Sequence, residues 1–95
     1  MTRAFLYPSY IEELRQACRK HLGEVVSTQE LQATIRVGEQ HVVALEEKQL
    51  RSFLTDMEAD LELILFTVDE DKQLDASKAI ARKILTRLEE WERDG

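Results

Sequence analysis

The sequence predicts an all-α fold, a bundle of three or four helices with a long central helix. Apolar residues recur at spacings of three and four along most of the 95 residues, as they do on one face of a helix. The chain has three glycines and one proline, fewer than the turns of an all-β or α/β domain require. A hydrophobic fraction of 43% is enough for one core, so we expect a single domain over residues 1–95.

Residues 1–8 read as an apolar lead-in that packs on the body of the protein or on a neighbouring subunit. A first helix is predicted over residues 9–22. Ser9 followed by Glu12 fits a capping box, in which each side chain satisfies an unpaired backbone N–H at the helix start, and Gly23 is a natural stop. The expected apolar line of this helix is Ile11, Leu14, Cys18, Leu22 and Val25.

The central stretch, residues 28–68, begins at a second capping box formed by Ser27 and Glu30. Two apolar sets follow, and the step of five residues from Leu45 to Leu50 rotates the second set by about 100° from the first. One straight helix cannot aim both sets at one small core. The first set is Leu31, Ile35, Gly38, Val42 and Leu45, and the second is Leu50, Leu54, Met57, Leu61, Ile64 and Val68.

Three arrangements of the central stretch follow from this pattern. A continuous helix would be roughly 60 Å long and would need a second chain to cover it. A helix bent or broken near Gly38, a residue type common just past a helix end, would bring Val43 into phase with Leu50. A small hairpin of residues 34–37 and 41–45 is the third arrangement, against which the helix-favouring residues on both sides argue.

Residues 69–75 are predicted to be a solvated loop or a frayed helix end. A last helix is expected over residues 75–93, capped by Asp75 or Ser77. It carries one broad apolar face and one basic face. The apolar face is Ile80, Ala81, Ile84, Leu85, Leu88 and Trp91, and the basic face is Lys78, Arg82, Lys83 and Arg87.

The net charge of −6 is concentrated in the middle of the chain. Residues 46–75 contain ten acidic and three basic residues, a net charge of −7, whereas both ends are mildly basic. An acidic middle with only mildly basic ends disfavours a nucleic-acid partner, which usually needs a basic patch, and an anionic membrane. No apolar run approaches the roughly 20 residues of a membrane-spanning helix. The single cysteine and the lack of a signal-peptide pattern fit the cytoplasm.

The candidate binding residues are all acidic. Their charge is suited to a basic protein partner. The alternatives are a solvated helix face and ion pairing with the basic face of the last helix. Within the central stretch these residues are Asp56, Glu58, Asp60 and Glu62, and directly after it they are Asp69, Glu70 and Asp71.

Metal-ligand patterns in the sequence are incomplete. Cys18 and His21 are spaced like half a zinc site to which His41 would add a third ligand, but structural zinc sites need four. Asp69, Asp71 and Asp75 match three positions of a calcium loop that here lacks its glycine and its terminal glutamate. A helical di-metal site would add Glu-x-x-His, and phosphate-binding glycine loops are absent. We therefore expect no metal, no cofactor and no catalytic residues.

These observations predict a non-enzymatic interaction module of the antitoxin, toxin-immunity or adaptor type that binds a basic protein. The order of a helix, an acidic helix and a further helix loosely resembles small bacterial immunity proteins. The alternative is a homo-oligomeric structural component, such as a homodimer in which a second copy covers surplus apolar surface. A small metal-dependent enzyme or a metal sensor is a more distant alternative.

Overall fold

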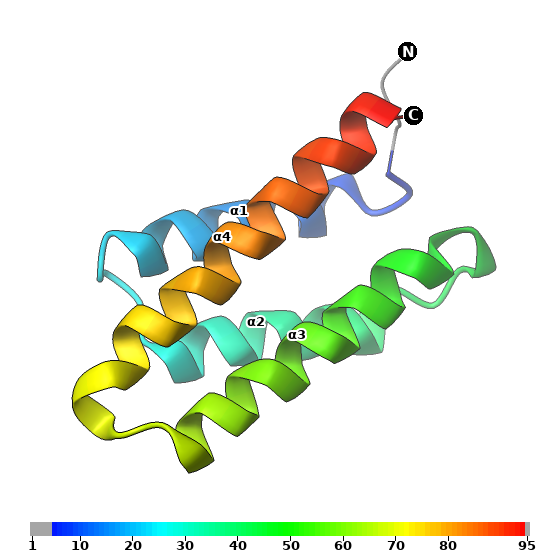
Figure 1. Cartoon of the computed structure of the whole chain (residues 1–95). Helices are drawn as coiled ribbons and strands as arrows, with labels where there is room; N and C mark the ends of the chain where they lie inside the picture. The colour runs from blue at the N-terminus through cyan, green and yellow to red at the C-terminus, as the bar shows by residue number, and fades with distance from the viewer. Residues whose placement is uncertain (1–4, 95) are drawn as a thin grey trace.

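The computed structural model describes residues 5–94, and within that range it consists of helices joined by short connections. The helices are α1 (Pro8–Leu22), α2 (Thr28–His41), α3 (Lys48–Thr67) and α4 (Glu70–Asp94), with a 3₁₀ turn, η1 (Leu45–Glu47), before α3. They run alternately up and down, with α1 and α2 in one layer and α3 and α4 in the other (Figure 1). Each helix packs on its two neighbours around the ring, α1 on α4 included. The predicted all-α bundle is confirmed.

The core lies between the two layers, and the apolar stripes of the sequence form most of it. Three predicted stripe residues lie outside the core: Leu45 is 85% exposed, Val25 is 73% exposed, and Val68 is only partly buried. All three belong to connections between helices, where the helical spacing that predicted their burial no longer holds. The largest fully buried apolar side chains are Ile11, Leu14, Leu31, Ile35, Leu50, Leu54, Met57, Leu61, Ile84 and Leu88.

The central stretch is broken, but after Gly38 rather than at it. α2 continues to His41, residues 42–44 are not helical, and α3 begins at Lys48. The chain from Phe5 to Tyr7 packs on this connection: Leu6 N–H donates to the buried Glu47 carboxylate at 3.0 Å, and Ala44 N–H donates to the Tyr7 hydroxyl at 3.2 Å. The continuous helix and the hairpin are therefore both wrong, and Val43, which is 66% exposed, does not join the second stripe.

Gly38 has a packing role inside α2. A Cβ added at this position would overlap the ring and the hydroxyl of Tyr10 from α1. The Tyr10 hydroxyl donates to the Thr34 carbonyl of α2 at 2.9 Å. The glycine therefore lets α1 and α2 approach closely, and its presence was wrongly interpreted as a helix end.

Of the two predicted helix starts with a capping serine, one is confirmed and the other is wrong. The start at Ser27 is confirmed, since its hydroxyl accepts the Glu30 N–H at 3.1 Å. The predicted cap at Ser9 is wrong, because α1 begins one residue earlier, at Pro8. The N-cap residue is Tyr7, whose side chain makes no capping hydrogen bond. Proline suits the first helical position because its fixed φ matches the helix and its missing N–H would have no partner there.

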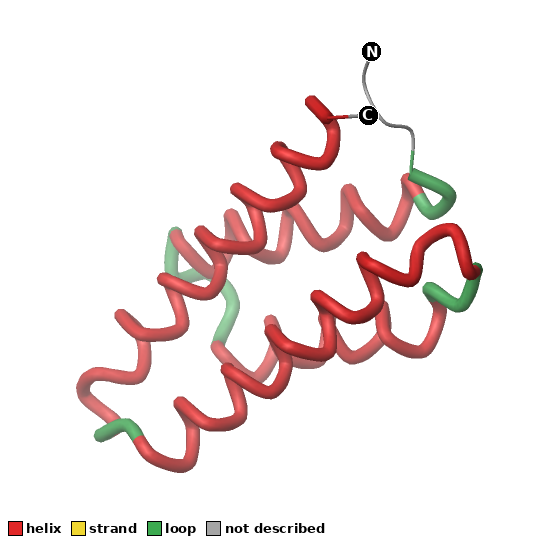
Figure 2. The backbone as a smooth tube through the Cα atoms, turned by 45° about the vertical axis from the view of Figure 1, so that its right-hand side comes forward, coloured by secondary structure: helices red, strands yellow, loops and turns green. Residues whose placement is uncertain are grey.

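The last helix begins at Glu70 and not at Asp75. Glu70 and Asp71 occupy its first turn, where carboxylates interact favourably with the partial positive charge of a helix N-terminus. Ser77, the other predicted cap, lies inside α4 and is fully buried. The expected loop over residues 69–75 is therefore wrong: residues 70–75 are the start of α4, and only Val68 and Asp69 form the turn, at the end of the bundle where α1 is joined to α2 (Figure 2).

Candidate interaction surface

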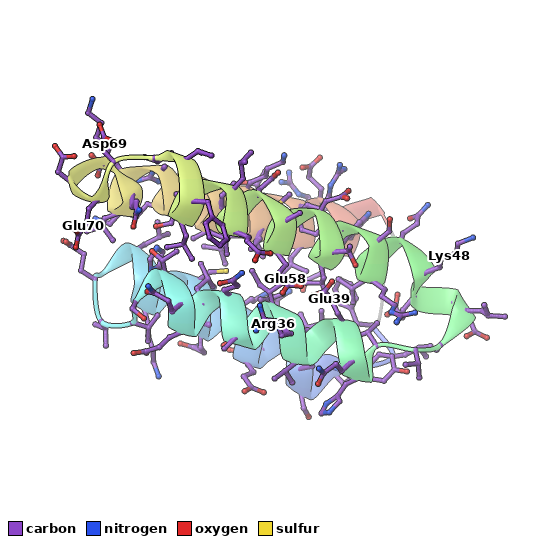
Figure 3. All side chains as sticks on the ribbon, turned by 90° about the horizontal axis from the view of Figure 1, so that it is seen from below. Arg36, Glu39, Lys48, Glu58, Asp69 and Glu70 are labelled. Atoms are coloured by element: carbon purple, nitrogen blue, oxygen red, sulfur yellow. The ribbon has the colours of Figure 1, made fainter. Side chains whose placement is uncertain are left out.

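The acidic side chains of α3 do not form one patch. Glu58 points into the groove between α2 and α3, where its carboxylate accepts a hydrogen bond from Arg36 Nε at 2.7 Å. Figure 3 shows Arg36, Glu39 and Glu58 gathered between these two helices, with Asp69 and Glu70 far from them at the end of the bundle. Glu58 is therefore already paired within the chain.

Glu39 and Glu58 form an unequal carboxyl pair. Burial, followed by the hydrogen bond to Glu58, raises the pKa of Glu39 above its ordinary value of 4.5. The same hydrogen bond, together with that from Arg36, lowers the pKa of Glu58 below 4.5. The pair holds a proton on Glu39 more readily than on Glu58, and Arg36 compensates the charge of the Glu58 carboxylate.

Asp56 and Asp60 lie on the other side of α3, along its groove with α4. Two adjoining hollows of about 330 and 380 Å³ follow this groove, and Lys83 and Arg87 of α4 line the second one opposite the two carboxylates. The Arg87 guanidinium lies 5.5 Å from the centre of the Trp91 ring. This placement favours the intramolecular interpretation for Asp56 and Asp60, with basic groups of the last helix across the groove.

Four acidic residues remain exposed at the end of the bundle, and we call them the acidic end: Glu62, Asp69, Glu70 and Asp71. None of the ion pairs found among residues 5–94 involves them. The structure therefore divides the seven predicted residues into three groups. The groups are Glu58 facing α2, Asp56 with Asp60 facing α4, and the acidic end facing solvent.

Sequence reasoning missed two exposed apolar residues beside the acidic end. Leu63 is 60% exposed and Phe66 is 81% exposed. At about 100° per residue they lie roughly 200° and 140° around α3 from the buried Leu61, so they point away from the core. The sequence did indicate their exposure, because both residues fall outside the 4-3-4 spacing of the buried stripe. The continuous apolar run of residues 63–66 obscured this.

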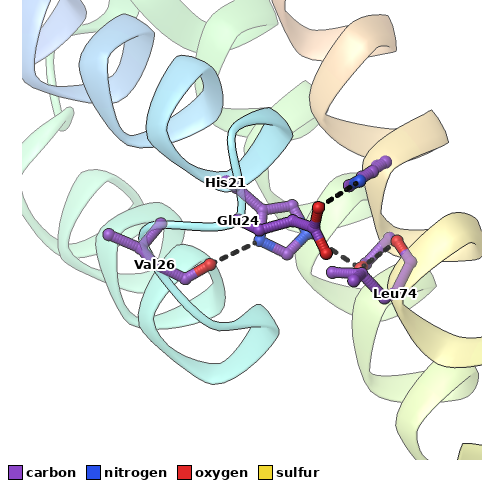
Figure 4. Close-up of polar contacts among 6 residues, drawn as sticks. His21, Glu24, Val26 and Leu74 are labelled. Atoms are coloured by element: carbon purple, nitrogen blue, oxygen red, sulfur yellow. Dashed lines mark hydrogen bonds and ion pairs between the residues drawn. The ribbon is translucent and has the colours of Figure 1, made fainter.

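A buried polar network joins α1, the start of α2 and α4 (Figure 4). His21 Nδ1 donates to the Val26 carbonyl at 2.9 Å, since a carbonyl can only accept, and His21 Nε2 lies 2.8 Å from the Ser77 hydroxyl. That hydroxyl also lies 2.9 Å from Thr28 Oγ1 and 3.0 Å from the Leu74 carbonyl. His21 and Ser77 are both fully buried, so this serine and histidine join the helices in the interior of the bundle.

The candidate zinc ligands do not converge. Cys18 is buried in the apolar core, where burial raises its pKa to about 12. His21 lies beside the start of α2, whereas His41 is exposed at the far end of that helix, about 20 Å away at 1.5 Å per residue. No group of three or more His, Cys, Asp or Glu side chains within the described residues is arranged to hold a metal ion.

The candidate calcium ligands lie partly on a helix. Asp71 and Asp75 are one turn apart on α4, and Asp69 precedes it. Gln73, which would supply the fifth position of the loop, donates instead to the Val68 carbonyl at 2.9 Å. The segment is therefore folded as a helix start, and its backbone does not wrap around a central point as a calcium loop must.

Comparison of the chain with protein-family models, curated proteins and solved structures found no match in any of the three. Within residues 5–94, no helix combines the length and the apolar character needed to cross a membrane.

Proposed function

We propose that this protein is a non-enzymatic interaction module of the antitoxin, toxin-immunity or adaptor type that binds a basic protein through the acidic end. One observation carries the proposal: Glu62, Asp69, Glu70 and Asp71 are exposed, and no ion pair within residues 5–94 involves them. Glu62 also lies within electrostatic range of Arg36, whereas the charges of Asp69, Glu70 and Asp71 are left for solvent ions or an outside cation to balance. The candidate residues in the two grooves face basic groups of the same chain and are less suited to this role.

The charge distribution of the chain supports the same surface. Between Ser52 and Asp71 the sequence has seven acidic residues and no basic residue. A surface of one sign raises the association rate of an oppositely charged partner and suppresses association with partners of like charge. Such steering is strongest at low ionic strength, since the screening length is only about 8 Å at physiological salt.

The experiment is cross-linking capture from the source lysate at low and at physiological salt, with identification of the captured proteins. The test variant is Glu62→Lys with Asp69→Lys. The matched control is Glu13→Lys with Glu90→Lys, which changes the net charge equally at exposed positions away from the acidic end. We expect the wild type and the control to capture the same basic protein and the test variant to lose it. Equal capture by all three proteins would refute the assignment to the acidic end.

A homo-oligomeric component is the second candidate, and exposed apolar residues at the opposite end of the bundle favour it. Leu6 is 56% exposed, Val43 66% and Leu45 85%, and the contacts of residues 6 and 7 with Glu47 and Ala44 bring this group together. Size exclusion with light scattering should then give about twice the 11.1 kDa chain mass, reverting to one chain mass on Leu45→Ser. A single chain mass at every concentration would contradict this candidate.

A further inference from the structure

One face of α3 presents apolar side chains to solvent. Ala59, Leu63 and Phe66 are spaced by four and three residues, so they fall on the same side of the helix, and all three are exposed. Leu63 and Phe66 retain 60% and 81% of their accessible surface. Single exposed apolar residues are common on protein surfaces, but two large ones in adjacent turns form a continuous apolar surface.

The acidic end borders this apolar surface. Glu62 precedes Leu63 directly and lies one turn before Phe66, and Asp69 to Asp71 follow within the next turn of the chain. The face is therefore apolar along the axis of α3. At the end that carries Leu63 and Phe66 the charged residues next to it in the chain are acidic, whereas Lys83 and Arg87 of α4 lie near Ala59. A matching partner needs an apolar stripe with positive charge beside it.

We propose that Leu63 and Phe66 bind the apolar face of a basic amphipathic helix, whose flanking lysines and arginines contact the acidic end. This inference deepens the proposed function and rests on it, because it specifies which part of the basic partner is recognised. Ala59 and Phe66 lie about 10 Å apart along α3, the rise of seven residues. That distance matches apolar anchors at positions i, i+3 or i+4, and i+7 of a bound helix.

Charge complementarity selects this occupant over a second copy of the chain. A twofold interface places each surface patch against the same patch of the other copy. A twofold interface centred on Leu63 and Phe66 would gather the acidic ends of both copies around one small apolar contact. An anionic lipid surface would be repelled by the same border. A cationic amphipathic helix would cover Leu63 and Phe66 with its apolar face and place its positive charges beside the acidic end.

The test uses two fluorescein-labelled peptides of about 18 residues with identical leucine and lysine content. In the first peptide the leucines form one helical face, and in the second they are distributed around the helix. Fluorescence anisotropy measures the binding of both peptides to the full chain at low and physiological salt. We expect the amphipathic peptide to bind at least about tenfold more tightly than the scrambled one, since a factor of ten is a modest share of what two apolar anchors provide.

Two variants assign the binding to residues. Leu63→Ser with Phe66→Ser should weaken binding of the amphipathic peptide at least about tenfold and leave binding of the scrambled peptide unchanged. The matched control is Val43→Ser with Leu45→Ser, which removes a similarly exposed apolar pair at the other end of the bundle. This control should leave the binding of both peptides unchanged. All four positions are exposed, so circular dichroism and the melting temperature should match those of the wild type.

The outcomes separate this inference from the proposed function. If both peptides bind equally tightly, and Glu62→Lys with Asp69→Lys abolishes the binding of both peptides, then the acidic end binds cationic peptides without an apolar anchor. The inference then falls while the proposed function stands. If neither peptide binds at low salt, both fall. If light scattering shows a dimer that Leu63→Ser with Phe66→Ser dissociates, a second copy is the occupant, and the inference is refuted.

Discussion

Replacing Gly38 by alanine should destabilise this protein, the reverse of what the same change does in most helices. An alanine in place of an interior helix glycine normally stabilises by about 1 kcal/mol, because it restricts the unfolded backbone. Here the new methyl group would overlap the Tyr10 ring and hydroxyl. Tyr10 is 92% buried, being 8% exposed, so its ring can leave only by separating α1 from α2 or by adopting a strained rotamer.

The expected magnitude combines three terms. Overpacking a filled core costs about 1–3 kcal/mol. The hydrogen bond from the Tyr10 hydroxyl to the Thr34 carbonyl, 2.9 Å long, contributes about 1 kcal/mol that the displacement removes. The helix-propensity gain of about 1 kcal/mol offsets the second term. We therefore expect Gly38→Ala to lower the free energy of unfolding by about 1–3 kcal/mol, or the melting temperature by at least about 4 °C.

Urea denaturation followed by circular dichroism measures this change, and a second background tests its cause. With Tyr10→Ala the ring is gone, and Gly38→Ala should then stabilise by about 1 kcal/mol, a change of sign. Gly23→Ala is the matched control, because a Cβ there makes ordinary contacts of 3.6 Å and longer and φ is −85°. A Gly38→Ala protein that is more stable than the wild type would refute the argument that this glycine serves close packing.

Three further predictions concern buried or coupled groups. The pKa of Glu39 is raised above 4.5 in the folded state, so the folded state binds a proton more tightly than the unfolded state does. The folded state therefore loses stability as pH rises from 4.5 through the raised pKa of Glu39. Glu39→Gln should accordingly raise the melting temperature at pH 7 and much less at pH 4. Ser77→Ala should lower the free energy of unfolding by about 1–3 kcal/mol, because it leaves His21 Nε2 and Thr28 Oγ1 without their shared partner. Cys18, with its pKa raised to about 12, should react with a disulfide reagent at pH 8 only as fast as the protein unfolds.

The first two of these predictions have matched control variants. Glu90→Gln, at an exposed position, should leave the pH dependence of stability unchanged, and an equal effect there would contradict the role of Glu39. Ser52→Ala removes an exposed hydroxyl and should be near neutral. For Cys18, native reaction at the rate of a small free thiol would show that the core opens without global unfolding.

Sequence periodicity predicted the helices of this bundle because most core positions repeat at helical spacing. Leu31 and Ile35 in α2, and Leu50, Leu54 and Leu61 in α3, are all fully buried as the pattern requires. The change of phase between the two sets correctly indicated that one helix could not contain both. The capping pair Ser27 and Glu30 succeeded for a related reason, since a local hydrogen bond between near neighbours is visible in a short window of sequence.

The errors have a common physical cause, because each depends on a contact between distant residues. Gly38 is explained only by Tyr10, which precedes it by 28 positions, and the break after His41 accompanies a hydrogen bond from Ala44 to Tyr7. No local pattern pairs His21 with Ser77. The division of the acidic residues among two grooves and one end likewise required the positions of α2 and α4, which the sequence of α3 does not contain.

The packing of α1 on α4 also has a consequence for synthesis of the chain on the ribosome. α1 emerges first, yet one of its two neighbours is the last helix to be made. Until α4 has left the exit tunnel, the nascent protein lacks Ala81, Ile84 and Leu88, and the His21 ring has no Ser77 hydroxyl to meet. A chain stalled or cut before α4 therefore holds α1, α2 and α3 around an open core, and its exposed apolar faces make it a substrate for chaperones and proteases.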